Sequence, residues 1–331
     1  MSWRTKLPSF VKGLPLVAVS RFAVRSAFTL NELLVVIVVI TVLLSGLIPA
    51  VNAAREAARR CQCQQHLRSW GQAFNAYVAA HRRYPLAATW RVGGDAQRPP
   101  QLARHSMFSF LLPFFDQQRL SQSIDYRQDW NCSRNIEWSK QELGGILICP
   151  SAPGNRRGKH ATDYTTAIRV DPAEAAIGRL VSTGVVRNRS RAGPPSWGAG
   201  QPVWEGILAL ETVDHRRHLI DRRVSRPEDV DDGLSKTVLL VENAGKPICY
   251  RHGRRANCHI TRFRWASPTI WMAINDVCGL SQLVNCHNNS QPYAFHRGGL
   301  QLLIADGSVR WVATSVAADV FVAAITRAAG D

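Results

Sequence analysis

The sequence predicts an α+β fold, in which a long N-terminal helix packs on a β-rich antiparallel C-terminal domain. Three observations lead to this prediction: an apolar run, a following amphipathic run almost free of helix breakers, and then short apolar runs separated by Gly, Pro, Asn and Asp. With 331 residues, 46% of them hydrophobic and 20% charged, the chain can bury a sizeable core. The expected parts are a leader at 1–27, a helix at 28–84 (a membrane-spanning segment at 28–48 and an amphipathic stem at 50–84), and a β-rich extracytoplasmic domain at 85–331.

The leader is basic. It contains five basic residues and no acidic one: Arg4, Lys6, Lys12, Arg21 and Arg25. Five of the +17 formal charges therefore belong to residues 1–27, which leaves +12 for the rest of the chain. Positive charge beside an apolar segment is typical of the cytoplasmic side of a membrane. The leader thus predicts that the residues after the apolar run lie outside the cytoplasm.

Residues 28–48 can cross a bilayer, because 21 helical residues extend for about 31 Å. Glu32 lies just inside this run, where a carboxylate is costly enough to suggest a functional reason. A helix cleaved before Phe28 would carry a new α-amino group one turn from Glu32, and the two charges could neutralise each other. A secretory signal peptide with a small-x-small cleavage site at 51–53, or a plain signal-anchor, is the alternative.

The stem is expected to be one long amphipathic helix. Pro49 should end or kink the apolar helix, since it lacks a backbone donor. Beyond it, apolar residues recur at helical spacing up to Arg83, and Tyr84-Pro85 stops the pattern. The side chains expected to face the domain are Leu67, Trp70, Phe74, Tyr77 and Val78.

Seven short apolar runs of the C-terminal part are candidate strands. They are Phe108–Phe115, Ile146–Cys149, Thr162–Val170, Gly206–Glu211, Thr237–Glu242, Leu300–Ile304 and Ser308–Ala313. Asp306-Gly307, followed by Ser308, joins the last two runs and predicts a hairpin with a type I′ turn. His296, which precedes Gly298 and Gly299, is interpreted as bonding a tight backbone turn.

Eight cysteines in an exported chain favour disulfides over metal ligation. Cys249 and Cys258 are close in sequence, as are Cys278 and Cys286, and both segments are rich in turn-forming residues. This spacing suggests two disulfides that each close a local loop. Cys61 and Cys63 point about 200° apart on a helix and cannot pair with each other. One of them could instead reach Cys132 or Cys149.

The sequence shows no spacing typical of a metal, cofactor or catalytic site. A metal set would have to draw on Cys258, His259, Cys278, Cys286, His287 and His296, without a CxxC or HExxH spacing. The chain also lacks Gly-x-Ser-x-Gly and phosphate-binding loops. We therefore expect no enzyme activity, no metal and no cofactor. A membrane-anchored hydrolase would need a convergent site that sequence order does not indicate.

The N-terminal segment resembles the type IV pilins and pseudopilins, in which a basic leader and a small residue precede Phe-Thr-Leu-x-Glu and an apolar helix. The matching residues are Ala27, Phe28, Thr29, Leu30, Glu32, Leu33 and Leu34, with Ala27 where Gly is usual. The resemblance implies cleavage after Ala27 by a prepilin peptidase that also N-methylates Phe28. It further implies that Glu32 pairs with a neighbouring subunit's N-terminus during assembly.

The rest of the chain resembles a large family of pilin-like proteins, abundant in planctomycete bacteria, with a C-terminal domain of unknown function. The matching segments, in the family's order, are residues 53–60, 111–118, 149–151, 162–164, 226–230, 232–237, 295–299 and 305–309. Lys236, where Asn is commoner, and Cys61 beside Cys63 depart from the pattern. The resemblance implies architecture and location, and no activity.

Together these features predict a non-enzymatic pilin-like or pseudopilin-like subunit, of the type II secretion or type IV pilus class. The apolar helix would place it in the inner membrane with its domain in the periplasm, and then in a fibre or at the cell surface. Its expected partners are the prepilin peptidase and other pilin-like subunits. The alternative is a membrane-anchored module whose basic surface, with Trp197, Trp204, Trp265 and Trp271, binds an anionic polysaccharide or DNA.

Overall fold

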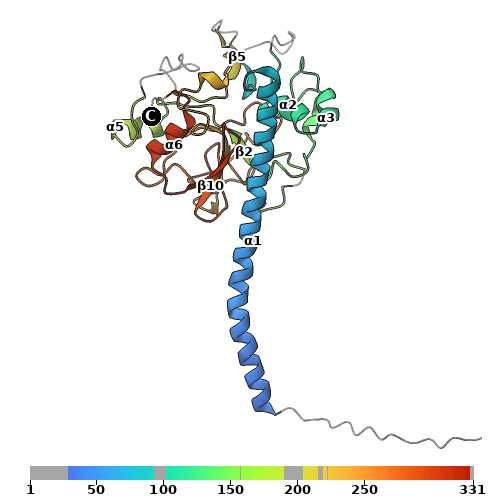
Figure 1. Cartoon of the computed structure of the whole chain (residues 1–331), viewed down its shortest axis with the longest axis vertical. Helices are drawn as coiled ribbons and strands as arrows, with labels where there is room; N and C mark the ends of the chain where they lie inside the picture. The colour runs from blue at the N-terminus through green and yellow to red at the C-terminus, as the bar shows by residue number, and fades with distance from the viewer. Residues whose placement is uncertain are drawn as a thin grey trace, which may run out of the picture. The chain divides into compact units, whose positions relative to one another are not determined.

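The computed structural model describes residues 29–92, 102–156, 158–189, 204–214, 219–221 and 223–328. The chain divides into two compact units, residues 1–52 and 53–331, which are described separately (Figure 1). Helix α1, Leu30–His81, begins in the first unit and ends in the second. The fold is α+β, and most of its strand pairs are antiparallel.

In the first unit, the described residues are almost entirely helical, and all their side chains are exposed. Among the described residues, α1 is the one helix long and apolar enough to cross a membrane, and a signal sequence would have the same character. The sequence predicted that Pro49 ends or kinks the helix. It does not end it, because α1 continues through Pro49. Proline removes one backbone hydrogen bond, and membrane-type helices tolerate that loss.

The second unit consists of short helices and strands around the remainder of α1. Its helices, including two 3₁₀ turns (η), are α2 Met107–Leu111, η1 Leu112–Phe114, α3 Gln118–Gln122, α4 Ile136–Ser139, α5 Ala175–Ser182, η2 Pro227–Asp229 and α6 Ala318–Ile325. Its strands are β1 Ala88–Val92, β2 Tyr164–Thr166, β3 Arg169–Val170, β4 Trp204–Glu205, β5 Leu210–Asp214, β6 Leu219–Asp221, β7 Val238–Glu242, β8 Tyr250–Arg251, β9 Arg254–Arg255, β10 Gly299–Ile304 and β11 Val309–Ala313.

The central sheet is antiparallel and has the strand order β11-β10-β7-β2. In its register Leu302 lies opposite Val241, and Val241 lies opposite Thr165. A second sheet, β1-β5-β6, contains the one parallel pair among the described strands, β1 with β5. β3-β4 and β8-β9 form separate two-stranded pairs. Residues of this central sheet belong to both hydrophobic cores of the unit, which are described next.

The stem packs on the first core as its pattern predicted. Leu67, Trp70 and Phe74 are fully buried in it, together with Leu239, Leu240 and Leu303 of the central sheet. Trp70 stacks on Phe115, with ring centroids 4.5 Å apart. The second core unites α5 and α6 with other residues of β7 and β10, including Val238, Val241 and Leu302. The central sheet therefore has α1 on one face and α5 and α6 on the other.

Two of the predicted strands are wrong. Phe108–Phe115 forms α2, η1 and the residue that ends η1, and Ile146–Cys149 forms turns. The buried positions Met107, Phe108, Leu111 and Leu112 repeat with the period of a helix, which a short apolar run does not reveal by itself. The other five runs contain or overlap strands of the structure, namely β2 and β3, β5, β7, β10 and β11.

The hairpin β10–β11 is present, but its turn is not type I′. Gly307 has a φ of +86°, whereas Asp306 does not have a positive φ. The Gly307 N–H donates to the Ile304 carbonyl, and the Ile304 N–H donates to the Ser308 carbonyl. This is a three-residue loop in which glycine takes the left-handed position. Asp306 accepts a hydrogen bond from the Ser308 N–H and holds the turn.

Candidate functional site

Four side chains that can ligate metals meet in the interior of the second unit. They are Cys63 of α1, Cys149 of the loop before β2, Glu242 at the end of β7, and His296 shortly before β10. All four residues are buried, and their donor atoms lie within 4.8 Å of one another. Chain segments more than 230 residues apart thus converge on one point.

The distances between the donor atoms are short. Cys63 Sγ is 3.6 Å from Glu242 Oε1, and Cys149 Sγ is 3.4 Å from His296 Nε2. His296 Nε2 is also 3.4 Å from Glu242 Oε1. The four groups therefore face a common centre.

A second layer of polar contacts orients these groups. His296 Nδ1 lies 2.8 Å from Oε1 of Glu56, a residue about two turns before Cys63 on α1. Glu56 is itself held by Arg59 and by the Ser151 hydroxyl, which donates at 2.9 Å. Because Nδ1 faces a carboxylate, it carries the proton, and Nε2 points to the centre with its lone pair when the ring is neutral.

The remaining atoms of the cluster also have partners. The Tyr164 hydroxyl lies 3.1 Å from Cys63 Sγ. Glu242 Oε2 accepts the Gln301 N–H at 3.2 Å. The Cys149 N–H donates to Asp163 Oδ2 at 2.7 Å. The positions of the donor atoms are therefore fixed from outside the cluster.

The pKa values of the cluster show how strongly its groups interact. The hydrogen bond with Cys149 lowers the pKa of the Cys63 thiol to about 6, although burial opposes this. The same bond, with burial, raises the pKa of Cys149. Burial, and then the charge on Cys63, raises the pKa of Glu242 well above its usual range. Burial lowers the pKa of His296, but the bond to Cys63 and the charge of Glu242 outweigh it, so that pKa rises to about 9. Cys63 is therefore the thiol that ionises more readily. The raised pKa values of Cys149 and Glu242 favour their uncharged forms, which limits the charge buried in the cluster.

Such an arrangement permits three kinds of chemistry. The four donor atoms could hold a metal ion, the two thiols could form a disulfide, or Cys149 could act as a nucleophile with His296 as its base and Glu56 orienting the base. A cavity of about 380 Å³ has Cys149, His66 and Trp265 among its lining residues. His296 does not line it, so a substrate there would not reach the base.

The sequence-based search missed most of this cluster. The sequence led us to expect that His296 bonds a tight backbone turn. Its ring nitrogens instead face Glu56, Cys149 and Glu242. Sequence analysis left open a pairing of Cys61 or Cys63 with Cys132 or Cys149, and the structure has all four as free thiols. Cys63 lies within 4.8 Å of Cys149 without a bond between them, whereas Cys61 is exposed. One signal was available: residues 56, 149, 151, 164 and 296 all lie in segments that carry the family resemblance.

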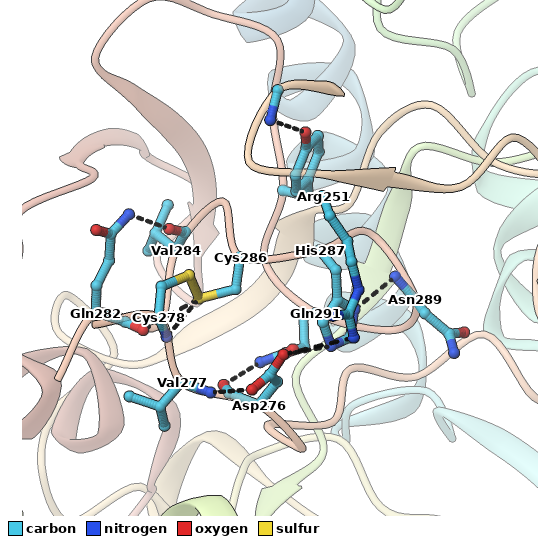
Figure 2. The surroundings of a disulfide bond; sticks show 12 residues. Arg251, Asp276, Val277, Cys278, Gln282, Val284, Cys286, His287, Asn289 and Gln291 are labelled. Atoms are coloured by element: carbon cyan, nitrogen blue, oxygen red, sulfur yellow. Dashed lines mark hydrogen bonds and ion pairs between the residues drawn. A yellow bond between two sulfur atoms is a disulfide. The ribbon is translucent and has the colours of Figure 1, made fainter. Parts of the chain in front are cut away.

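The cysteines of the expected loop closures form disulfides, Cys249–Cys258 and Cys278–Cys286. Their sulfurs are therefore not available for the metal set considered from sequence. Figure 2 shows the second disulfide beside Asp276, which lies 3.7 Å from both His287 Nε2 and an Arg251 guanidinium nitrogen. The Asn289 N–H donates to His287 Nδ1, so this histidine is held within a loop network.

Of the N-terminal site residues, Ala27 and Phe28 lie outside the described residues. Glu32 is exposed and closes a capping box: its carboxylate accepts from the Thr29 N–H at 2.9 Å, and its own N–H donates to the Thr29 hydroxyl at 3.2 Å. Leu33 and Leu34 follow on the exposed apolar surface of α1. The structure therefore gives Glu32 a local role at the start of the helix.

The residues around the hairpin take special backbone conformations. Gly298 has a φ of +89°, and a Cβ at Gly299 would collide with the Val312 carbonyl, so neither position accommodates a side chain easily. This geometry fixes the chain direction between His296 and β10.

Comparison with known proteins identifies a family. Neither a curated protein nor a solved structure matches this chain. The model of the family described as "Protein of unknown function (DUF1559)" matches residues 52–319, which nearly coincide with the second compact unit. Because the match spans well over half of the sequence, the chain belongs to this DUF1559 family of proteins of unknown function.

Proposed function

We propose that this protein is a non-enzymatic, pilin-like structural subunit that a prepilin peptidase processes and that assembles through its N-terminal helix into a pseudopilus or pilus-like fibre. The helix would hold the subunit in the inner membrane before assembly, with the folded domain in the periplasm. Other pilin-like subunits would be its partners in the fibre.

One observation carries this proposal. Helix α1 is continuous over 52 residues, its first part exposes apolar side chains on every side, and its later part belongs to the core of the folded unit. Every leucine, valine and isoleucine from Leu33 to Ile48 is exposed. Such a surface requires a cover of lipid or of other apolar helices, and packing against like helices is what a fibre core would provide.

The Phe-Thr-Leu-Asn-Glu order at the start of this helix supports the same proposal. A simple anchor gains nothing from Glu32, whereas a fibre subunit would use it to neutralise the N-terminus of a neighbour. The capping box with Thr29 offers a competing local explanation, since such a box stabilises a helix start by satisfying its free donors. The two roles can be separated by substitution.

The test compares Glu32→Ala with Thr29→Val in the native host. Thr29→Val removes the hydroxyl of the capping box but keeps the carboxylate. We expect both variants to insert in the membrane, Glu32→Ala to lose assembly into sedimentable fibres, and Thr29→Val to keep most of it. Equal assembly by Glu32→Ala and the parent would refute the registration role.

Mass spectrometry of the mature N-terminal peptide tests processing. N-methyl-Phe28 as first residue is the expected result. A start near Ala54 would instead indicate a released protein, and an intact Met1 a plain anchor. Either of these results would contradict the assembly proposal.

A basic surface segment supports the second candidate, a membrane-anchored module that binds an anionic polymer. Between Glu242 and Asp276 the chain has no acidic residue, and five arginines there are exposed: Arg251, Arg254, Arg255, Arg262 and Arg264. The Cys249–Cys258 disulfide fixes the hairpin β8–β9 that carries three of them. Counterion release makes binding by such a surface salt-dependent.

Retention on immobilised DNA and on sulfated polysaccharide tests this candidate. Arg254→Gln/Arg255→Gln should elute at lower salt than the parent, if the hairpin binds the polymer. The matched control is Arg82→Gln/Arg83→Gln, which removes the same charge from an exposed site after α1. Equal losses in both variants would mean that net charge alone causes retention.

A further inference from the structure

We propose that Cys63, Cys149, Glu242 and His296 form a closed, tetrahedral zinc site that ties helix α1 to the central sheet of the folded domain. The metal would have a structural role and would leave no coordination position for a substrate. The proposal does not depend on the assembly function and concerns the second unit alone.

The distances between donor atoms fit a single zinc ion. Bonds of about 2.3 Å to sulfur and about 2.0–2.2 Å to nitrogen and oxygen place tetrahedral donors about 3.4 Å apart for N and O, and about 3.6 Å apart when one donor is sulfur. The observed separations are 3.4 Å for His296 Nε2 to Glu242 Oε1, and 3.6 Å for Cys63 Sγ to Glu242 Oε1. Cys149 Sγ to His296 Nε2 is 3.4 Å. Two edges of the tetrahedron therefore already have the required lengths, and the third, from Cys149 Sγ to His296 Nε2, is about 0.2 Å short of it.

The chemistry of the donor set also favours zinc. Two thiolates, one imidazole and one carboxylate supply four ligands of the kinds that zinc takes, and two sulfur donors disfavour magnesium and calcium, which prefer oxygen. Four protein ligands complete a tetrahedron, which is typical of structural rather than catalytic zinc.

The outer contacts are those of a built metal site. The pair of His296 Nδ1 with Glu56 Oε1 at 2.8 Å aims Nε2 at the centre, as in carboxylate–histidine–zinc arrangements. The Tyr164 hydroxyl at 3.1 Å from Cys63 Sγ can donate to a thiolate, and the Gln301 N–H fixes the second oxygen of Glu242. Three of the four ligands are therefore oriented before a metal arrives.

Electrostatics also favours a bound cation at this cluster. Three potential anions are buried here around one histidine, and burying an unpaired carboxylate or thiolate is costly. A divalent cation would offset that cost.

The two other chemistries explain less of the geometry. A Cys63–Cys149 disulfide would leave Glu242 and His296 buried side by side without a function. A Cys149 nucleophile would need a base that a substrate can approach, whereas the His296 side chain is fully buried and does not line the cavity beside Cys149. Glu242 and Cys63 also occupy the space in front of the His296 ring nitrogen that a substrate would require.

The first experiment measures zinc in the full chain, purified in detergent under reducing conditions. We expect roughly one zinc per chain, retained through buffer exchange, as for other four-ligand structural sites. Cys63→Ser, Glu242→Gln and His296→Gln should each reduce zinc content severalfold or more. Cys61→Ser is the matched control, because it removes a thiol two residues away on the exposed face of the same helix.

A second measurement does not depend on whether the variants fold. Replacing zinc by Co²⁺ in the parent should give the intense visible absorption of a tetrahedral site and thiolate-to-cobalt charge-transfer bands. Cys61→Ser should give the same spectrum. An octahedral spectrum without thiolate bands would overturn the proposal.

Three further results would overturn it. They are a reduced parent that takes up neither metal, zinc content that is unchanged in Cys63→Ser and His296→Gln, and a Cys63–Cys149 disulfide peptide in protein taken from its native membrane. The last result would identify the cluster as an oxidised thiol pair.

Discussion

At the scale of single residues, Glu56 shows how one carboxylate can act through another side chain. It does not face the centre of the cluster, but it holds the His296 ring through Nδ1, with Arg59 and Ser151 holding it in turn. Glu56 is therefore a positioning residue in the proposed site, and Ser151 extends its reach to the Cys149 loop.

Glu56→Gln should weaken zinc binding by roughly 10- to 100-fold, the usual effect of losing an outer carboxylate partner. A neutral amide is a poorer acceptor and leaves the imidazole a weaker ligand. Competition with a chromophoric chelator measures the affinity. Arg59→Gln, which removes the ion-pair partner of Glu56, should change the zinc affinity much less. Equal effects of the two substitutions would mean that the ion pair matters rather than the orientation of His296.

Lys246 is a second residue with an unusual environment. It is fully buried, and its ammonium group donates to the Arg262 carbonyl at 3.2 Å. Burial is the main reason that the pKa of Lys246 is lowered to about 8; the charge of Asp163 opposes the shift, and the charges of Arg156 and Arg262 add to it. Because the unfolded value is near 10.5, the unfolded chain binds more protons between pH 8 and 10.5, and stability from this group rises with pH over that window.

Lys246→Met should remove this dependence. We expect the free energy of unfolding of the parent to rise, relative to that of the variant, by on the order of 2–3 kcal/mol from pH 7.5 to pH 10. Guanidinium titrations of both proteins across this range provide the measurement. A constant difference between them would mean that Lys246 keeps an ordinary pKa in the folded state.

At the scale of elements, helix α1 meets the turn of hairpin β10–β11 through two glycines. A Cβ at Gly71 would lie 3.1 Å from the Gly307 carbonyl oxygen and 3.0 Å from Leu303 Cδ1. The side chain of Asn75, one turn later, approaches Gly307 from the same helix. Because Gly71 and Gly307 have no side chains, the helix can approach the turn closely.

Gly71→Ala should lower the free energy of unfolding by about 1 kcal/mol, because overpacking costs about 1–3 kcal/mol and exceeds the gain of about 1 kcal/mol in helix propensity. Chemical denaturation measures the change. Gln72→Ala, at the neighbouring exposed position, should stay within about 0.5 kcal/mol of the parent. A stabilised Gly71→Ala protein would show that the turn moves away without cost.

The elements that the sequence predicted well are those with a long, regular pattern. Leu67, Trp70 and Phe74 recur at helical spacing, and β7 and β10 are apolar runs bounded by turn residues. The strand prediction for residues 108–115 failed because a mostly apolar run of eight residues can form a buried helix or a strand, and tertiary packing decided between them. The hairpin turn failed because Asp-Gly was assigned to a two-residue loop, whereas Ala305 belongs to the turn as well.

At the scale of the whole molecule, the candidate site could not be predicted from sequence spacing. Cys63, Cys149, Glu242 and His296 are separated by 86, 93 and 54 positions, so no local motif joins them. They converge because α1, β7 and the segment before β10 pack around one core. Cysteine counting favoured disulfides, which accounts for Cys249, Cys258, Cys278 and Cys286 and leaves the buried pair to a different chemistry.

The distribution of burial along α1 leads to a last prediction, that a chain beginning at Ala53 folds without the apolar segment. All described side chains from Thr29 to Arg55 are exposed, and both cores and the four clustered ligands lie at Cys63 or later. We expect this truncated chain to be soluble without detergent, to unfold cooperatively in circular dichroism, and to bind zinc like the parent. A chain beginning at Leu67 is the control: it lacks Glu56 and Cys63, so it should lose the zinc and the cooperative transition. If the Ala53 chain aggregates, the apolar segment contributes to folding as well as to assembly, and the separation of the two roles along one helix is wrong.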